Sequence, residues 1–440
     1  MSQPSSTNWS ELYASLSTEM MPWGPPLADG RVIEVAEMFG GPSGGGVDTE
    51  AVFGGPMGIG FEAEYAAIRQ RVGVMHLPQR AVIQLTRADV KDYLHRLCTQ
   101  EINGLEGGQS VRTYQLDEKG HIASDMIVHH GDESTWLEMD VFDLPWVKDL
   151  IEARLFTEDV TAEDWTDKRT FFWLLGPAAA QLLTATAGDD QADRVAAMST
   201  MPGTHHVIDV PTADGQRLPC TAYRWDLGNV LGVRLAVPSE RAVEVFGRLL
   251  VESGFEAGAE PDAALAERRR ASMRGRPVGW SAFNTVRIEE GVPWYHIDFG
   301  RDSLPAEVPG DRGIDAAVSF TKGCYLGQEV VARMKSLGHP KKVIVGLRVT
   351  DADPAAALEL PGVSGSQVFE VNKKDKVIGG VTSSTASPLR GQAGIGLAVV
   401  RWGRHRAGTK VMVPAVGAAG AGGGKLIEAE VVKLDALVSG

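Results

Sequence analysis

One short stretch of the sequence combines residue types that are able to do chemistry. Between residues 320 and 334 a single cysteine, Cys324, lies between Lys322 and Glu329. Gly323 and Gly327 flank it, and glycine permits backbone conformations and a close ligand approach that other residues do not. A thiol near an ammonium group is favoured as the thiolate, which is its nucleophilic form. The stretch is therefore a candidate site for chemistry centred on Cys324.

The residues after the cysteine predict the element that would position it. The pattern from Gln328 to Met334 indicates a short apolar helix, so Gln328 and Glu329 fall in its first turn, where main-chain N–H groups attract anions. Such a helix start would lower the pKa of the Cys324 thiol further. The alternative is an inert, buried cysteine in an ordinary turn that leads into a helix. The local pattern alone leaves both interpretations open.

Composition limits the class of protein. The 440 residues are 43% hydrophobic and 23% charged, which is typical of a globular chain of two or three domains. The net charge of -14 argues against extensive binding to nucleic acid or to an anionic membrane. Cys98, Cys220 and Cys324 are widely separated, so we predict neither a disulfide framework nor a metal site. Without a basic leader or a long apolar run, we expect a cytoplasmic protein without a membrane segment.

The octapeptide at residues 322–329, Lys-Gly-Cys-Tyr-Leu-Gly-Gln-Glu, resembles a known signature. This is the K-G-C-[FYW]-x-G-Q-E pattern of the YgfZ branch of the superfamily that also holds the glycine-cleavage T-protein, an aminomethyltransferase. Every fixed position of the pattern is kept. The resemblance implies an α+β fold of three domains set in a ring, with tetrahydrofolate bound near the central opening. It implies catalytic roles for Cys324 and Lys322, and folate contacts from Tyr325, Gln328 and Glu329.

The sequence from residue 61 to about 139 predicts a β-α-β-β unit preceded by a helix. Its elements are a helix over 61–72, a strand over 80–85, a helix over 87–99, and two strands over 110–116 and 122–129. The two last strands flank a turn that ends in Gly120, where a positive φ is needed. The same run resembles the first conserved block of the T-protein superfamily.

Asp125 lies among apolar residues of the second hairpin strand, on the same face as Ile127. A carboxylate in that position either points to solvent or is partnered, because burying a bare charge is costly. The resemblance offers a further role, since T-proteins carry an aspartate here that touches folate. By that resemblance Asp125 is a candidate general acid or base as well as a folate ligand. Tyr114, on the partner strand, is a second candidate folate contact.

Two later segments also resemble the family, and one departs from it. Arg287, in an Arg-Ile-Glu-Glu-Gly segment, and Glu307, in a Leu-Pro-Ala-Glu segment, match family positions and are candidate folate contacts. Residues 227–238 stand where T-proteins have an acidic block, and here the acidic residues are gone. A carboxylate that grips the pterin by paired hydrogen bonds is thereby missing. A basic concentration over 267–276 is a solvated surface, or else a site for anionic folate polyglutamate or RNA.

The ends of the chain differ from its centre. A helix is expected over 8–21, followed by a glycine-rich segment over 40–60 that we interpret as a flexible insertion or lid. Short strands with Gly- and Pro-rich turns beyond residue 340 predict a small β-barrel. The expected domains are therefore an extension over 1–60, a folate-binding region of two intertwined α+β, ferredoxin-like parts over 61–335, and the barrel over 340–440.

Three functions fit these patterns. The signature and the lost acidic block favour a YgfZ-like protein that binds tetrahydrofolate or a derivative and supports iron–sulfur enzymes, which would be its partners. The second is an aminomethyltransferase, or another tetrahydrofolate-dependent transferase or demethylase. The third is a scaffold with a vestigial site. The sequence does not decide whether the protein turns over a substrate.

Overall fold

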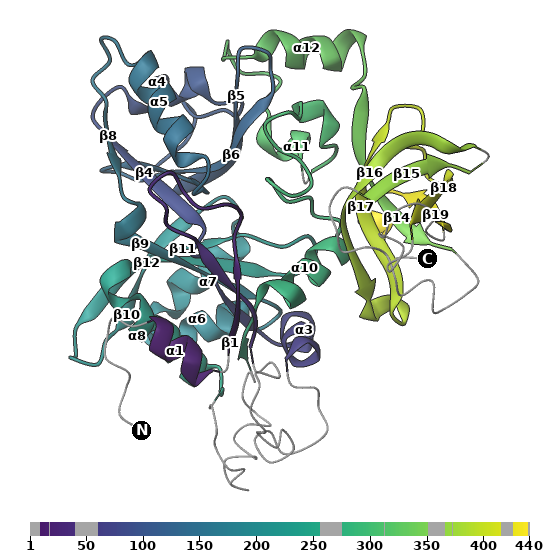
Figure 1. Cartoon of the computed structure of the whole chain (residues 1–440). Helices are drawn as coiled ribbons and strands as arrows, with labels where there is room; N and C mark the ends of the chain where they lie inside the picture. Colours follow the sequence, from purple (N-terminus) through teal and green to yellow (C-terminus); the bar gives the residue numbers. More distant parts are fainter. Residues whose placement is uncertain are drawn as a thin grey trace, which may run out of the picture.

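The computed structural model describes residues 9–16, 18–39, 60–255, 275–311, 313–350, 366–371, 373–414 and 426–438. These residues form an N-terminal hairpin, two sheets with their helices, and a C-terminal barrel, which Figure 1 shows to the right of the sheets. The predicted mixed α and β fold is confirmed. The segment 40–59, most of the basic run at 267–276 and residues 415–425 lie outside the described residues.

The first sheet contains the predicted β-α-β-β unit. Its strand order is β5-β6-β7-β4-β8, all antiparallel where they pair. The elements are β4 (Arg80–Thr86), α4 (Val90–Leu97), β5 (Gln109–Leu116), β6 (Ile122–His130), β7 (Thr135–Asp140), α5 (Leu144–Arg154) and β8 (Thr161–Asp164). The helix predicted over 87–99 is shorter at both ends. Arg87 has a φ of 97°, which no helix contains, and Cys98 is extended, with a φ of -99° and a ψ of 150°.

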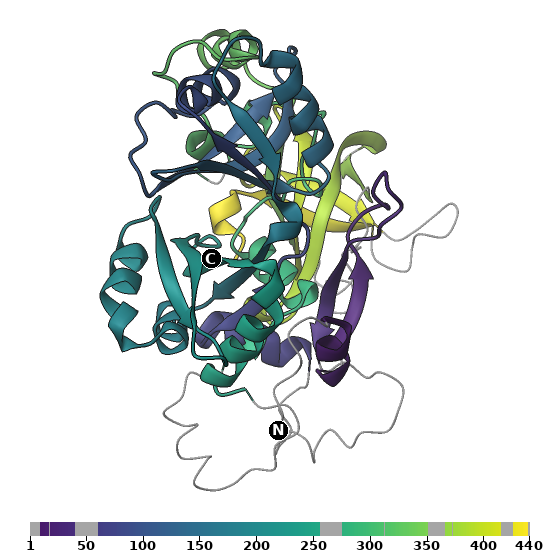
Figure 2. The same ribbon diagram turned by 90° about the vertical axis from the view of Figure 1, so that its left-hand side faces the viewer.

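The second sheet has the strand order β10-β11-β12-β9-β3-β13. Its elements are α3 (Phe61–Gln70), β3 (Gly73–His76), β9 (Arg169–Leu175), α6 (Ala179–Ala187), α7 (Ala192–Thr200), β10 (His205–Pro211), β11 (Arg217–Arg224), β12 (Gly232–Pro238), α8 (Ala242–Glu252) and β13 (Arg276–Pro277). Strand β12 is buried along its whole length because helices cover one face and the first sheet lies against the other side. Figure 2 shows the two sheets one above the other.

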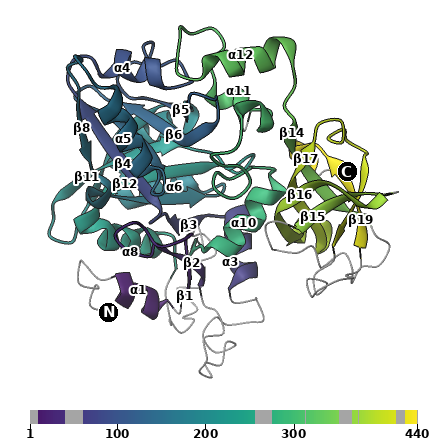
Figure 3. The ribbon, with the colours of Figure 1, turned by 45° about the horizontal axis from the view of Figure 1, so that its top comes forward.

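The C-terminal barrel is closed, as the short strands predicted. Its order is β14-β17-β16-β15-β18-β19, from strands β14 (Lys342–Val349), β15 (Ser366–Glu370), β16 (Lys373–Ser387), β17 (Ala393–Arg401), β18 (Lys410–Pro414) and β19 (Leu426–Val432). Valine, isoleucine and alanine side chains fill its interior. The chain reaches it through α10 (Trp280–Glu289), α11 (Ile314–Ala317) and α12 (Gln328–Leu337). Figure 3 shows α10 between the sheets and the barrel.

The N-terminal residues differ from the predicted helix over 8–21. Helix α1 (Trp9–Ser15) is short, and the chain then forms β1 (Thr18–Pro22), which pairs antiparallel with β2 (Glu34–Phe39). The helical pattern rested on residues up to Leu16, so nothing in it required a helix beyond that point. From Thr18 onward, pairing with β2 holds the chain in an extended conformation. The hairpin packs against α10, and Trp23, just after β1, is buried against Trp280.

Candidate functional site

A pocket lies between the two sheets, and the loop that follows α10 forms part of its wall. It holds about 630 Å³ of space, its open mouth included. The first sheet supplies four polar residues to its wall, and the second sheet and its loops supply tryptophan and charged residues. The lining residues are Arg80, Arg112, Asp125, Ile127, Asp140, Trp173, Trp225, Asp226, Leu227, Arg234, Val292, Pro293, Trp294 and Tyr295.

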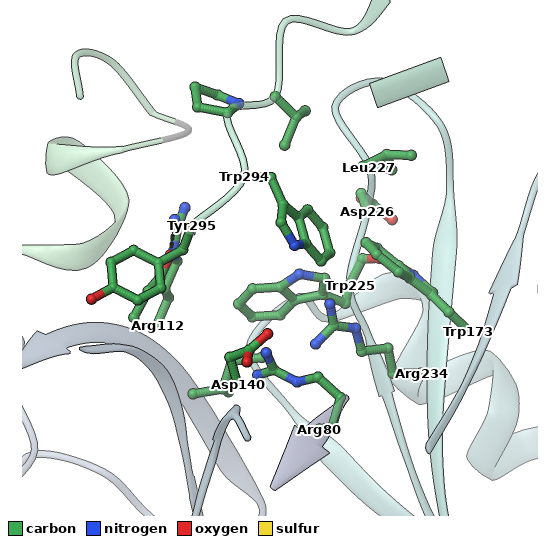
Figure 4. A pocket seen from close by; sticks show the side chains of 14 residues that line it. Arg80, Arg112, Asp140, Trp173, Trp225, Asp226, Leu227, Arg234, Trp294 and Tyr295 are labelled. Carbon is green, nitrogen blue, oxygen red and sulfur yellow. Dashed lines mark hydrogen bonds and ion pairs between the residues drawn. The ribbon is translucent and has the colours of Figure 1, made fainter. Parts of the chain in front are cut away.

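Three indole rings form the aromatic part of the pocket. The ring centroids of Trp173 and Trp294 lie 6.3 Å apart, and Trp173 Nε1 donates a hydrogen bond of 2.9 Å to the carbonyl of Trp225. The guanidinium of Arg234 lies 4.3 Å from the Trp173 ring centroid and 5.4 Å from that of Trp225. Figure 4 shows these rings grouped with Arg80 and Arg234 below them. The arrangement suits a flat, polar aromatic ligand, because such a ring stacks on indole and guanidinium planes.

Asp125 on β6 is partnered within the pocket wall by Arg112 on β5. Arg112 Nε donates to Asp125 Oδ1 at 2.9 Å, and Nη2 donates to Oδ2 at 2.5 Å. Both side chains are largely buried, at 17% and 15% exposure. Burial alone would lower the pKa of Arg112, but the charge and hydrogen bond of Asp125 raise it. The carboxylate is thus held by a two-point ion pair, which fixes its direction. Of the two alternatives that the strand pattern left open, the partnered carboxylate is the one found.

A fully buried carboxylate, Glu138 on β7, holds the two remaining pocket arginines. It accepts from Arg80 Nε at 2.8 Å and from Arg234 Nη1 at 2.6 Å, and also from the Tyr223 hydroxyl. Burial would raise the pKa of Glu138, but the two arginines and His129 lower it well below its usual range. Because Arg80 and Arg234 belong to different sheets, Glu138 ties the sheets together beneath the pocket. Arg234 Nε is buried and has no hydrogen-bond partner among the described residues.

Asp140, at the end of β7, is a further carboxylate of the pocket lining. Its oxygens accept from Trp23 Nε1 at 3.1 Å and from the main-chain N–H of Phe142 at 3.1 Å. Burial raises its pKa. The N-terminal hairpin therefore contributes to the site through Trp23, a role that the sequence pattern gave no means of predicting.

The stretch that carries Cys324 lies at the end of the β5–β6 hairpin and is absent from the pocket lining. Gly327 has a φ of 80° and caps α12, so Gln328 and Glu329 occupy its first turn, as predicted. Glu329 is exposed and pairs with Arg333 one turn later. Tyr325 is buried in the same apolar cluster as Tyr114, which is itself fully buried. The two candidate folate contacts Tyr114 and Tyr325 therefore belong to one apolar cluster, and the guanidinium of the pocket residue Arg112 lies over the Tyr114 ring.

The ammonium of Lys322 has partners other than the thiol that it was expected to activate. Its ammonium donates to the main-chain carbonyls of His95 at 2.5 Å, Cys98 at 2.6 Å and Gln100 at 2.9 Å. An ammonium has three protons, and these bonds use all of them. Burial lowers the pKa of Lys322 to about 8. The geometry gives Lys322 the role of fastening the loop to the end of α4.

The three cysteines differ in accessibility. Cys324 is exposed, whereas Cys98 and Cys220 are buried. Burial raises the pKa of Cys98 to about 11 and that of Cys220 to about 12. The alternative of a buried packing role for Cys324 is therefore wrong. Among the described residues, no group of three or more His, Cys, Asp or Glu side chains is placed to hold a metal ion.

Arg287 and Glu307 lie outside the pocket lining as well. Arg287 is fully buried and donates to Asp298 Oδ2 at 2.7 Å and to Ser383 Oγ at 2.6 Å, so it links α10 to the barrel. Glu307 accepts from the main-chain N–H of Leu304 at 3.3 Å and closes a tight turn. Burial raises the pKa of Glu307. Both residues have structural partners that account for their types.

Sequence reasoning missed most of the pocket. Arg234 is a charged residue inside an apolar strand, and the argument applied to Asp125 also applies to it. Arg80 begins β4, and Arg112 lies in a strand with several polar residues, so their signal was weaker. Such residues need partners and mark a site or a buried ion pair. The tryptophans carried no comparable signal, because an aromatic residue in a strand is usually a core residue.

Fold and pocket together define a class: an α and β body with a polar, tryptophan-lined pocket between two sheets, followed by a closed barrel. Residues 43–322 match the family model described as the GCVT N-terminal domain, and the chain belongs to this family. The match ends at the first residue of the signature stretch. In the described part of the chain, no helix is long and apolar enough to cross a membrane.

Relatives and solved structures agree with this assignment. An aminomethyltransferase from Halalkalibacterium halodurans is 24% identical over 363 residues, which cover 80% of this chain and 84% of that protein. One from Prosthecochloris aestuarii is 24% identical over 383 residues, covering 84% and 89%. The glycine cleavage system aminomethyltransferase T from Bartonella henselae is similar in structure, with a TM-score of 0.70 at 18% identity, covering 97% of this chain and 96% of that one. The predicted T-protein fold is thereby confirmed.

Proposed function

We propose that this protein binds a reduced folate in the pocket between the two sheets and supports iron–sulfur enzymes through Cys324, in the manner of the YgfZ branch. The observation that carries the proposal is the exposure of Cys324 in a stretch with the YgfZ signature, while the other two cysteines are buried. A thiol that acts on a partner protein has to be accessible. The folate-binding region would comprise residues 61–335, and the barrel 340–440.

The pocket residues suit a folate. A pterin is a flat ring with hydrogen-bond donors and acceptors on its edge, and the indole rings of Trp173, Trp225 and Trp294 supply flat apolar surface. The buried, unpartnered Nε of Arg234 supplies a donor, and Asp140 and Asp125 supply acceptors. When bound, tetrahydrofolate supplies a nitrogen that carries one-carbon units. The arginines would also favour the anionic glutamate tail over a neutral ligand.

Asp125 would act in this site as a positioned acceptor. Arg112 already binds both carboxylate oxygens, and each oxygen keeps a lone pair for a ligand. The ion pair holds the carboxylate in a fixed direction, which suits a hydrogen-bond acceptor for a bound ligand. The geometry therefore supports folate binding more strongly than acid–base catalysis by Asp125.

Aminomethyl transfer is the second candidate function. It is favoured by the names of the relatives and by the aspartate retained on β6. Against it stands Arg234, which occupies the pocket in the segment where T-proteins are acidic. A guanidinium and a carboxylate have opposite hydrogen-bonding capacity, so the pterin would be held differently.

One set of measurements tests the proposal. Wild type and Cys324→Ala are titrated with tetrahydrofolate by calorimetry, and both are expressed in cells that lack the endogenous YgfZ protein. We expect equal folate affinity and a loss of iron–sulfur enzyme activity in cells with the alanine variant. Full rescue by Cys324→Ala contradicts the role of the cysteine. Rapid release of ammonia from aminomethyl-lipoyl protein and tetrahydrofolate, near the typical enzyme median of about 10 per second, would establish the transferase instead.

A further inference from the structure

A compact basic and aromatic cluster lies on the surface of the barrel, well separated in sequence from the pocket residues. It consists of the last residue of β17, the turn that follows it, and the segment that joins α12 to β14. Trp402 is 40% exposed, and its main-chain N–H donates to the carbonyl of Lys341 at 2.8 Å, which holds the two segments together. The cluster comprises His339, Lys341, Arg401, Trp402, His405 and Arg406.

Trp402 is the centre of a stack of three rings. His339 lies parallel to it, with centroids 4.8 Å apart and an interplanar angle of 4°. His405 lies on its other side at 4.0 Å and 27°. The stack keeps a partly exposed indole in a fixed orientation.

The charge of this cluster is positive and largely uncompensated. Lys341, Arg401 and Arg406 are exposed, and none of them makes an ion pair with a described carboxylate. Arg404, in the same turn, is paired with Glu370 and is left out of the cluster. The pKa of His405 is lowered by burial and then by Arg406 and His339, with no acidic residue acting against them. A chain with a net charge of -14 thus presents a local site for negative charge.

We infer that this cluster is a docking surface for an acidic segment of a protein partner. Charge complementarity selects an anionic occupant. A nucleic acid is the less suitable one for two reasons. Both faces of Trp402 are already covered by imidazole rings, so no base can stack on it. A long polyanion would also extend beyond the cluster onto an acidic protein, whereas a short acidic segment meets the cluster alone.

The position of the cluster relates it to Cys324. Helix α12 has 10 residues and spans about 15 Å. Cys324 precedes its N-terminus, and Lys341 follows its C-terminus, where Figure 1 shows the chain turning down into the barrel. Lys335 on α12 adds a positive charge between them and lies over the Phe320 ring. A partner held at the cluster would lie along α12, with Cys324 within reach; this last step rests on the proposed function.

The docking surface is tested with the full-length protein and a short dye-labelled peptide of alternating glutamate and glycine. Fluorescence anisotropy measures binding to wild type, to Arg401→Glu/Arg406→Glu, and to Lys168→Glu/Arg194→Glu as a control with the same change in charge elsewhere on the surface. We expect the first variant to bind at least about tenfold more weakly and the control to bind like wild type. Added salt should weaken binding to wild type.

Several outcomes would overturn the inference. Equal loss in both variants would mean that total charge, not the cluster, determines binding. Equal binding of a glutamine-for-glutamate peptide would exclude a charge-based surface. Tighter binding of oligothymidylate that is lost in Arg401→Glu/Arg406→Glu would assign the cluster to nucleic acid. Folate affinity should be unchanged in this variant, so a failure of folate binding in the wild type would overturn the proposed function and leave the docking surface standing.

Discussion

The ammonium of Lys322 donates a hydrogen bond of 2.6 Å to the main-chain carbonyl of Cys98, just beyond the end of α4. Its other two bonds go to the carbonyls of His95 and Gln100. The last carbonyls of a helix carry partial negative charge and lack partners within the helix. Lys322 donates to one such carbonyl, that of His95 in the last turn of α4, and also to those of Cys98 at the C-cap and Gln100 beyond it. These bonds fix the loop that presents Cys324. The lysine of the signature, Lys322, is therefore explained by a structural role, since its hydrogen bonds hold the loop in place.

Replacement of Lys322 by methionine should destabilise the protein. Methionine keeps much of the apolar stem but leaves buried carbonyls without donors, which costs roughly 1 to 3 kcal/mol for each group left unpaired. Urea unfolding measures the loss, and Lys119→Met, at an exposed hairpin position, is the matched control that should change little. If Lys322→Met were as stable as Lys119→Met, the fastening role would have to be given up.

Cys324 should react with iodoacetamide faster than the other two thiols. Cys98 and Cys220 are buried, and burial raises the pKa of their thiols to about 11 and about 12. Little thiolate is then present at neutral pH, and little reagent reaches it. Peptide mass spectrometry after timed alkylation gives the three rates. Alkylation of Cys324 at a rate no faster than that of the other two thiols would contradict its exposure.

Cys324→Ala should change the free energy of unfolding by no more than about 0.5 kcal/mol, as is usual for exposed positions.

Asp125→Asn should weaken folate binding by about 1 to 3 kcal/mol, because the amide loses one acceptor and the pair with Arg112. The double-mutant cycle with Arg112→Gln separates the two effects. If Asp125 acts on folate directly, its substitution should still weaken binding when Arg112 is already replaced. Should Asp125→Asn have no effect in that background, the carboxylate would serve only to hold Arg112. Calorimetric titration of the four proteins decides between these results.

The sequence predicted the parts of the fold that rest on local pattern. The β-α-β-β unit around Asp125, the barrel strands and the helix start at Gln328 follow from periodicity, turn residues and glycine positions, and all are found. Features that depend on contacts between residues distant in sequence could not be predicted. The pairing of β1 with β2 turned a predicted helix into a strand, and Trp23 bonds to Asp140, which lies 117 residues later in the sequence.

In the pocket too, residues marked by local pattern were predicted, and those that depend on contacts distant in sequence were not. Asp125 was found because a charge in an apolar strand needs an explanation. Its partner Arg112 lies on the other strand of the predicted hairpin, although the ion pair itself was not predicted. The bond between Arg234 and Glu138 joins strands of two different sheets, and no local pattern specifies that contact. Lys322 was assigned to Cys324 by its nearness in sequence, but the loop directs its side chain to α4. Sequence distance is a poor guide to contact in a turn.

The last prediction concerns Glu64 on α3, which fastens the N-terminal hairpin. Its carboxylate accepts from the main-chain N–H of Phe39 at 2.5 Å and from that of Gly279 at 2.8 Å, and so joins β2 to the start of α10. Burial raises its pKa from 4.5 to about 7. The folded state therefore binds a proton more tightly than the unfolded state between these two values. As a result, the free energy of unfolding should fall as pH rises from about 4.5 to about 7, by about 1.4 kcal/mol per unit of pKa difference.

Glu64→Gln isolates this effect, because glutamine resembles the protonated acid and does not titrate. The difference in unfolding free energy between wild type and Glu64→Gln, measured by urea unfolding at pH 5 and at pH 8, should shift against the wild type at the higher pH. Every other titrating group is shared by the two proteins and cancels in the difference. A difference that stays constant from pH 5 to pH 8 would mean that the pKa of Glu64 is close to its unfolded value. The N-terminal hairpin would then be held equally firmly throughout that range.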